Sequence, residues 1–114
     1  MSTRATYQFK TEHSGTHTVY IHYDGYPLGA SHYLENAISE KGLVSTERFL
    51  RFNKNAQLTK SHEAHGDTEY RYTITGDNIL VFKRIDQNWV QKFDGIIVDF
   101  IMFAKQYNDD WEII

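Results

Sequence analysis

The residues of this chain best suited to chemistry are His22 and Asp24, which stand two positions apart within the stretch His22–Gly29. On a continuing strand both side chains would point to the same face. A carboxylate beside an imidazole can orient the ring or share a divalent metal ion with it. The pair therefore supports one hypothesis, a small metal-dependent or acid–base enzyme centred on His22 and Asp24.

A wider metal site would also need His13 and His17, which lie across the same predicted hairpin. Three imidazoles and one carboxylate would then converge, but recognised zinc sites show pairs of closely spaced ligands, and this spacing matches none. The structural interpretation is a turn, in which Asp24 accepts backbone N–H groups, Gly25 takes a positive φ and His22 donates to a loop carbonyl. Since Asp-Gly is a strong turn signal, we favour the turn and expect no metal or cofactor.

Three other patterns carry less information. The histidines of His62-Glu63-Ala64-His65 stand three apart, whereas a metalloprotease helix spaces them by four, and no apolar helical face accompanies them. Ser2 would become an N-terminal nucleophile if Met1 were removed, but no oxyanion hole accompanies it. The stretch Gly25–Gly29 matches no nucleotide-binding glycine pattern.

Composition favours one small globular domain. The chain has 114 residues, enough for a single core, and 40% of them are apolar and 24% charged. It has no Cys, which excludes disulfides, thiol nucleophiles and Cys-ligated metal sites. No run is long and apolar enough to span a membrane, and the first residues lack the apolar segment of a signal peptide. We therefore expect one cytoplasmic α+β domain over residues 1–114.

Charge and aromatic content bear on partners. The net formal charge is −3, and residues 58–114 carry six Lys and Arg against ten Asp and Glu. Without a basic stripe, direct binding to nucleic acid is not expected. Aromatic residues make up 15% of the chain, and eight of them are Tyr. Because Tyr suits positions that are buried at one end and wet at the other, a Tyr-rich sheet is typical of a contact face.

The first half of the chain predicts a hairpin followed by two helices. Apolar residues alternate in two runs joined by a short Gly-containing loop, as in paired strands. Pro suits the first turn of a helix, Lys-Gly its end, and Ser or Thr the cap of the next helix. The predicted elements are strands over 4–11 and 16–23, a helix from Pro27 to Lys41-Gly42, and a shorter helix from Ser45 or Thr46 through Phe52.

The second half predicts a polar segment, three strands and a last helix. Residues 53–68 show no apolar pattern and are interpreted as a surface loop. The order ββααβββα then predicts an α+β fold, with an antiparallel sheet of about five strands and helices on one face. The predicted elements are strands over 69–75, 79–85 and 89–93, a helix from its N-cap Asp94 to Tyr107, and an apolar tail, Trp111–Ile114.

The start, Ser2-Thr3-Arg4-Ala5, the stretch Val19–Pro27 with Gly29 two residues on, and the strand Glu69–Ile74 are the recognisable segments of this chain. They resemble a family of small proteins found in bacteria, phages and mobile elements. Members open with a Ser/Gly-Thr-Arg-Ala/Ser segment and carry His-Trp-Asp-Gly-Tyr-Pro after the second strand. The resemblance covers residues 2–34 firmly and residues 69–93 loosely, and it implies one α+β domain in a phage or prophage context. The chain departs from the family pattern at Tyr23, where Trp is usual, and over 44–66.

These features favour a non-enzymatic protein that binds a host protein in the host cell cytoplasm. In a phage context the target could be a host defence complex, as for an anti-CRISPR protein. A third hypothesis is a homodimer or other homo-oligomer, in which the tail packs across a two-fold axis. The expected partner-binding residues, on the solvent side of the sheet and nearby loops, are Tyr20, Tyr26, Glu69, Arg71, Asp109, Asp110 and Trp111.

Overall fold

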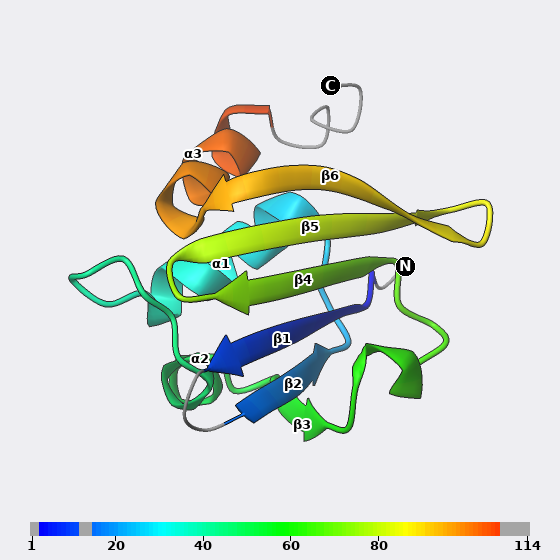
Figure 1. The fold of residues 1–114 in the computed structure, drawn as a ribbon, viewed down its shortest axis with the longest axis horizontal. Helices are drawn as coiled ribbons and strands as arrows, with labels where there is room; N and C mark the ends of the chain where they lie inside the picture. Colours follow the sequence, from blue (N-terminus) through cyan, green and yellow to red (C-terminus); the bar gives the residue numbers. More distant parts are fainter. Residues whose placement is uncertain (1–2, 12–14, 108–114) are drawn as a thin grey trace.

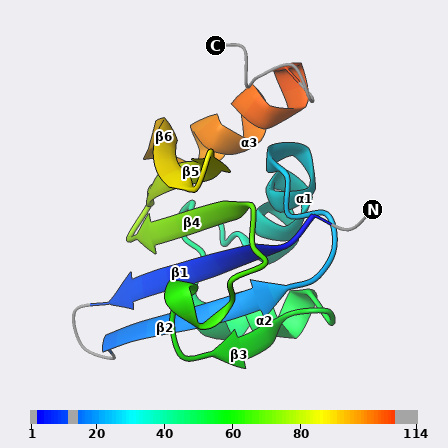
Figure 2. The same cartoon turned by 90° about the vertical axis from the view of Figure 1, so that its right-hand side faces the viewer.

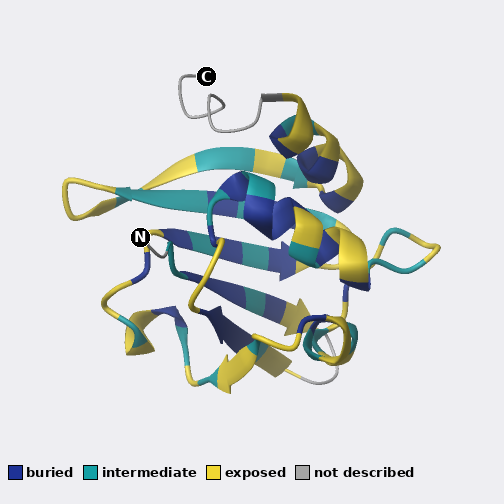
Figure 3. Cartoon of the chain, turned by 180° about the vertical axis from the view of Figure 1, so that it is seen from behind, coloured by how far each residue is buried: buried dark blue, intermediate teal, exposed yellow. Residues whose placement is uncertain are grey.

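The computed structural model describes residues 3–11 and 15–107. Within these residues a six-stranded sheet runs through the molecule, and three α-helices lie on one of its faces (Figures 1 and 3). The elements in chain order are β1 (Ala5–Thr11), β2 (Gly15–Ile21), α1 (Pro27–Ala37), α2 (Thr46–Phe52), β3 (Gln57–Thr59), the 3₁₀ turn η1 (His62–Ala64), β4 (Tyr70–Thr75), β5 (Asn78–Ile85), β6 (Asn88–Ile96) and α3 (Ile97–Tyr107).

The sheet is antiparallel except at its centre. The strand order is β3-β2-β1-β4-β5-β6, and among the described strands β1 and β4 alone pair in parallel. The predicted α+β class with helices on one face is therefore confirmed. The predicted order also holds, with one further short strand, β3, inserted before β4.

Alternation along the strands decides which side chains reach the helices. In β1, Tyr7 and Phe9 are buried against the helices, so Thr6 and Gln8 point to the opposite face. Tyr7 stacks on Tyr72 of β4, with ring centroids 4.8 Å apart and planes 10° from parallel. The core between sheet and helices also contains Val19, Ile21, Leu34, Phe49, Ile79, Val81, Phe100 and Ile101.

The hydroxyl groups of the stacked pair Tyr7 and Tyr72 have different surroundings. The Tyr72 hydroxyl donates to the carbonyl oxygen of Gly25 at 2.6 Å. The Tyr7 hydroxyl is buried without a hydrogen-bond partner among the described residues. Burial raises the pKa of Tyr7 well above its usual value, so this hydroxyl stays protonated.

We expect the two Tyr→Phe substitutions to differ in their effect on stability. Tyr72→Phe should lower the free energy of unfolding by about 1–2 kcal/mol, because it leaves the buried Gly25 carbonyl without its donor. Tyr7→Phe should leave that free energy unchanged or raise it by about 1 kcal/mol, since it removes an unsatisfied polar group. Urea denaturation of both variants measures the difference; equal destabilisation by both would contradict this account of the pair.

Helix α1 begins as predicted and ends early. Pro27 occupies its first turn, where a missing N–H needs no partner. The helix stops at Ala37, before the predicted end at Lys41-Gly42. After it the chain forms a tight turn, in which the Ser39 N–H donates to the Leu43 carbonyl at 2.8 Å and Gly42 takes φ 78°. The Lys-Gly pair thus belongs to this turn rather than to the helix end.

Helix α2 begins at the predicted cap and supports the end of α1. The Ser45 hydroxyl accepts a hydrogen bond from the backbone N–H of Arg48 at 3.1 Å, which confirms the cap. The Arg48 guanidinium donates to the carbonyls of Ala37 and Ile38 at 2.7 and 3.3 Å. These carbonyls lack partners within their own helix, so a cation from α2 satisfies the end of α1.

The prediction that Asp94 caps the last helix is wrong. Strand β6 continues through Asp94 and Gly95 to Ile96, and α3 starts at Ile97. The Asp94 carboxylate instead accepts from the side-chain amide of Asn78 at 3.3 Å. Residues 94–96 remain in strand conformation because they continue to pair with β5, as far as Asn78, the first residue of β5.

The surface-loop interpretation of residues 53–68 is wrong where the segment forms β3 and where its side chains are buried. Residues 57–59 form β3, which pairs with β2 and is an edge of the sheet. Residues 60–68, which we call the strap, then cross β1 and β2 to reach β4 (Figure 2). His62 and Thr68 of the strap are buried. The strap therefore covers part of the sheet face opposite the helices.

Candidate functional site

The stretch His22–Gly29 joins β2 to α1 through close backbone contacts. Asp24 takes φ 56°, so the positive φ expected at Gly25 falls one residue earlier. Gly25 is required for a different reason, because a Cβ there would lie 2.7 Å from the Cβ of Ala5. Its N–H donates to the Thr3 carbonyl at 2.9 Å. The stretch therefore fastens the start of α1 to the start of β1.

The structure does not bring His22 and Asp24 together as a pair. Strand β2 ends at Ile21, and the left-handed backbone at Asp24 breaks the alternation that would have placed both side chains on one face. Both residues are exposed. The Asp24 carboxylate accepts from the Tyr26 hydroxyl at 3.3 Å, while Nδ1 of His22 lies 3.5 Å from the Tyr20 hydroxyl.

The residues of the wider metal hypothesis lie apart. His17 pairs with Phe9 in the first half of β2, and His22 follows the other end of this strand. Five residues of extended chain separate them by about 17 Å. His13 lies outside the described residues. In residues 3–11 and 15–107, no group of three His, Asp or Glu side chains is placed to hold a metal ion.

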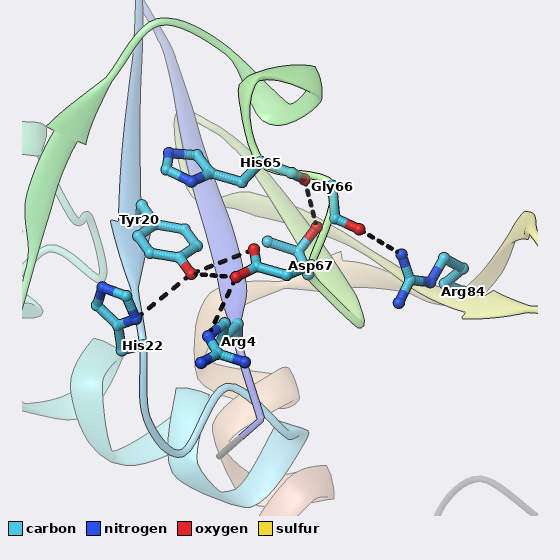
Figure 4. A network of polar contacts seen from close by, with 8 residues as sticks. Arg4, Tyr20, His22, His65, Gly66, Asp67 and Arg84 are labelled. Atoms are coloured by element: carbon cyan, nitrogen blue, oxygen red, sulfur yellow. Dashed lines mark hydrogen bonds and ion pairs between the residues drawn. The ribbon is translucent and has the colours of Figure 1, made fainter.

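A polar network instead surrounds Tyr20 (Figure 4). Its hydroxyl donates to the carboxylate of Asp67, with oxygen distances of 3.0 and 3.2 Å, and Asp67 also forms an ion pair with Nε of Arg4 at 3.2 Å. The His65 ring stacks on the Tyr20 ring, with centroids 3.7 Å apart. Burial, and next the hydrogen bond to Asp67, raise the pKa of Tyr20, so its hydroxyl remains a donor.

The Tyr20 network attaches the strap to the sheet. Tyr20 lies on the sheet face expected for it, but only 3% of it is exposed, so it is not available as a contact residue. Arg84 of β5 adds a further attachment by donating to the Gly66 carbonyl at 2.8 Å. Sequence reasoning missed Asp67 and considered His65 only as part of the pattern His62–His65, because both residues stand in a polar segment without periodicity.

The other expected contact residues are spread over the surface. Tyr26 is partly buried against the core, at the residue before α1. Glu69 is exposed, and its backbone links the Arg4 carbonyl to the Arg84 N–H, both at 2.9 Å. Asp109, Asp110 and Trp111 lie outside the described residues, as does the tail of the homo-oligomer hypothesis, which stays a prediction.

Arg71 belongs to a second cluster, on the half of the same sheet face beyond the strap. Its guanidinium lies 4.0 Å from the centroid of the Trp89 ring, and its Nη1 lies 3.8 Å from the Glu63 carboxylate. In β5, Leu80 and Phe82 alternate with core residues and point to this face, where both are partly exposed. We call Arg71, Leu80, Phe82 and Trp89 the β4–β6 face.

A cavity of about 390 Å³ opens at the carboxyl ends of the parallel strands β1 and β4. Apolar side chains dominate its lining, and Lys10 supplies the one ionisable group among the lining residues. A single ammonium group without a second titratable partner does not make an acid–base pair. The cavity is lined by Phe9, Lys10, Thr11, Leu43, Val44, Ser45, Ile74, Thr75 and Gly76.

Comparisons with models of protein families, with curated proteins and with solved structures found no match. No helix in the described part of the chain is long and apolar enough to cross a membrane. By its fold the chain is an α+β protein with one helix-covered sheet face and a second face that the strap covers in part.

Proposed function

We propose that the protein acts by binding another protein through the β4–β6 face. The observation that carries the proposal is the stack of the Arg71 guanidinium on the Trp89 ring, on the sheet face opposite the helices. Trp and Arg are the residue types that most often dominate binding energy at protein interfaces. Here the partly exposed side chains of Leu80 and Phe82 surround them with apolar surface.

The character of this face favours a partner with acidic and apolar side chains. Arg71 lies on it, Arg84 lies beside it as the strand partner of Trp89, and the exposed Glu63, at 3.8 Å from Arg71, compensates only part of their charge. A carboxylate of the partner could replace Glu63 beside Arg71, while an apolar side chain covers Phe82. The rigid β-sheet backbone below these residues keeps them in place before binding, which reduces the entropy lost on association.

The sequence resemblance adds a context to this proposal. On the resemblance of residues 2–34 to small proteins of phages and mobile elements, we propose a phage or prophage context. We propose a host protein as partner, and inhibition of a host defence complex as the consequence of binding. The β4–β6 face lies on β4, β5 and β6, apart from the stretch His22–Gly29 that carries most of the resemblance.

Trp89→Ala should weaken binding at least thirtyfold, because it removes both the largest apolar surface of the face and the support of the Arg71 guanidinium. The experiment captures partners from host lysate with the tagged protein, identifies them, and measures the affinity of the purified partner for each variant. Met102→Ala is the matched control, since Met102 is 65% exposed on α3, on the other side of the sheet.

The two variants separate the proposed surface from other surfaces. Partner affinity should be unchanged by Met102→Ala, and thermal unfolding should show that both variants are folded. If Trp89→Ala binds as tightly as the unmodified protein, the β4–β6 face is not the binding surface.

A further inference from the structure

The strap is held against the sheet by a buried histidine. Only 8% of His62 is exposed. Its Nδ1 lies 2.6 Å from the Thr6 hydroxyl of β1, and its Nε2 lies 3.4 Å from the Thr73 hydroxyl of β4. The imidazole therefore bridges the two central strands on the face opposite the helices. Any opening of the strap must remove this ring from between the two hydroxyls.

The charged groups around His62 come from each element packed against it. Arg71 of β4 and Lys10 of β1 disfavour a positive charge on the ring, and Glu63 of the strap itself favours it. Burial is the largest effect, followed by Arg71, and the pKa of His62 is lowered from 6.5 to about 4. At neutral pH the docked ring is therefore neutral.

We propose that the strap is a pH-sensitive cover, which leaves the sheet in mild acid when His62 takes up a proton. A group whose pKa is lower in the docked state than in the free state stabilises docking. This stabilisation is complete above the pKa of the free group, and it is lost as the pH falls toward the pKa of the docked group. For His62 that window extends from about pH 6.5 down to about pH 4. Release would expose Thr6 and Tyr20, which are buried and contact His62 and His65 of the strap.

A second attachment holds the strap to the sheet without His62. Asp67 pairs with Arg4 and Tyr20, and the Gly66 carbonyl accepts from Arg84. Burial, and next the hydrogen bond to Asp67, raise the pKa of Tyr20, so its hydroxyl stays a donor throughout this pH range.

His65, the other imidazole of the strap, stacks on the Tyr20 ring, and its Nε2 lies 2.8 Å from the Thr59 hydroxyl. A His65→Gln variant, which should keep the pH response, separates its contribution from that of His62. The inference is independent of the proposed partner, because it concerns a contact within the chain.

Hydrogen exchange of backbone amides at pH 7 and pH 5 tests the inference. After correction for intrinsic exchange rates, opening of residues 60–68 should increase about twentyfold at pH 5, the factor that follows from the two pKa values. Hydrogen exchange of the backbone amides of β1 and β4 should not accelerate in this way. Equal acceleration of core and strap amides, or no acceleration of either, would overturn the proposal.

Two variants and a titration complete the test. His62→Gln cannot take up a proton, so its strap should open at the same rate, after correction, at both pH values. His32→Gln, at an exposed position of α1, should keep the full pH response. If His62→Gln does not fold, an NMR titration of the His62 ring in the unmodified protein decides. Titration near pH 6.5 would overturn the proposal, and so would titration near pH 4 without any change in the strap signals. Titration below pH 6.5 in which the backbone signals of residues 60–68 change in the same step would support it.

Discussion

Gly29→Ala should prevent stable folding, or lower the free energy of unfolding by about 3 kcal/mol or more. In an ordinary helix this change is stabilising by about 1 kcal/mol, because Ala is the better helix former. At Gly29 an added Cβ would overlap the Asp24 carbonyl oxygen and lie 2.8 Å from the Asp24 carbonyl carbon. Both are atoms of a backbone turn rather than of a flexible side-chain end, so the turn or α1 must move.

The location of the contact makes such movement costly. Asp24 already holds a left-handed backbone, and the adjacent Gly25 is tied to both Thr3 and Tyr72 by hydrogen bonds. Moving α1 would instead disturb Ala30 and Leu34, which are fully buried. A methyl group at Gly29 would therefore require the turn or α1 to move, and either movement would destabilise the fold.

Gly66→Ala is the matched control for this prediction. No atom lies within 4 Å of an added Cβ at Gly66, and its φ is outside the left-handed region. Its free energy of unfolding should stay within about 1 kcal/mol of the unmodified value. Urea denaturation of both variants gives the comparison. A Gly29→Ala protein as stable as Gly66→Ala would show that the close approach to Asp24 is not required.

Signals from neighbouring residues predict those elements whose formation depends on interactions between neighbouring residues. Alternation predicted the hairpin, Pro27 predicted the start of α1, and Ser45 predicted the cap of α2, because each acts on neighbouring backbone. The prediction that Asp94 caps a helix was wrong because it considered neighbouring residues alone. The side chain can cap a helix, but strand pairing with β5 decides the conformation of Asp94. Strand β3 is three residues long and mostly exposed, so it leaves no periodic signal.

The site was less accessible to sequence reasoning, because its contacts join distant segments. His22 and Asp24 stand out by composition, yet the partner of Tyr20 is Asp67, 47 positions further along the chain. The stack of Arg71 on Trp89 likewise depends on two hairpins that bring β4, β5 and β6 side by side. Arg71 was selected as a contact residue because it lies on a well-predicted strand. Trp89 was not selected, because the strand predicted over 89–93 shows no clear alternation to indicate its face.

Phe49→Ala should lower the free energy of unfolding by about 3–5 kcal/mol. Phe49 is fully buried, and its ring lies 4.8 Å from that of Tyr7 and 5.2 Å from that of Phe9, measured between centroids. It is the one buried residue of α2, a helix of seven residues that is too short to be stable alone. Loss of this ring therefore leaves a cavity in the core and removes the main contact of α2 with the sheet.

Phe52→Ala tests whether this effect is specific to burial, because both residues are phenylalanines of the same helix. Phe52 is 45% exposed, and the Arg48 guanidinium lies 5.3 Å from the centroid of its ring. A cation–π contact at an exposed site contributes about 0.5–1 kcal/mol, so the expected loss is of that size. Chemical denaturation of the two variants should therefore differ by at least about 2 kcal/mol. Similar losses would mean that α2 contributes to stability through its helix rather than through the Phe49 side chain.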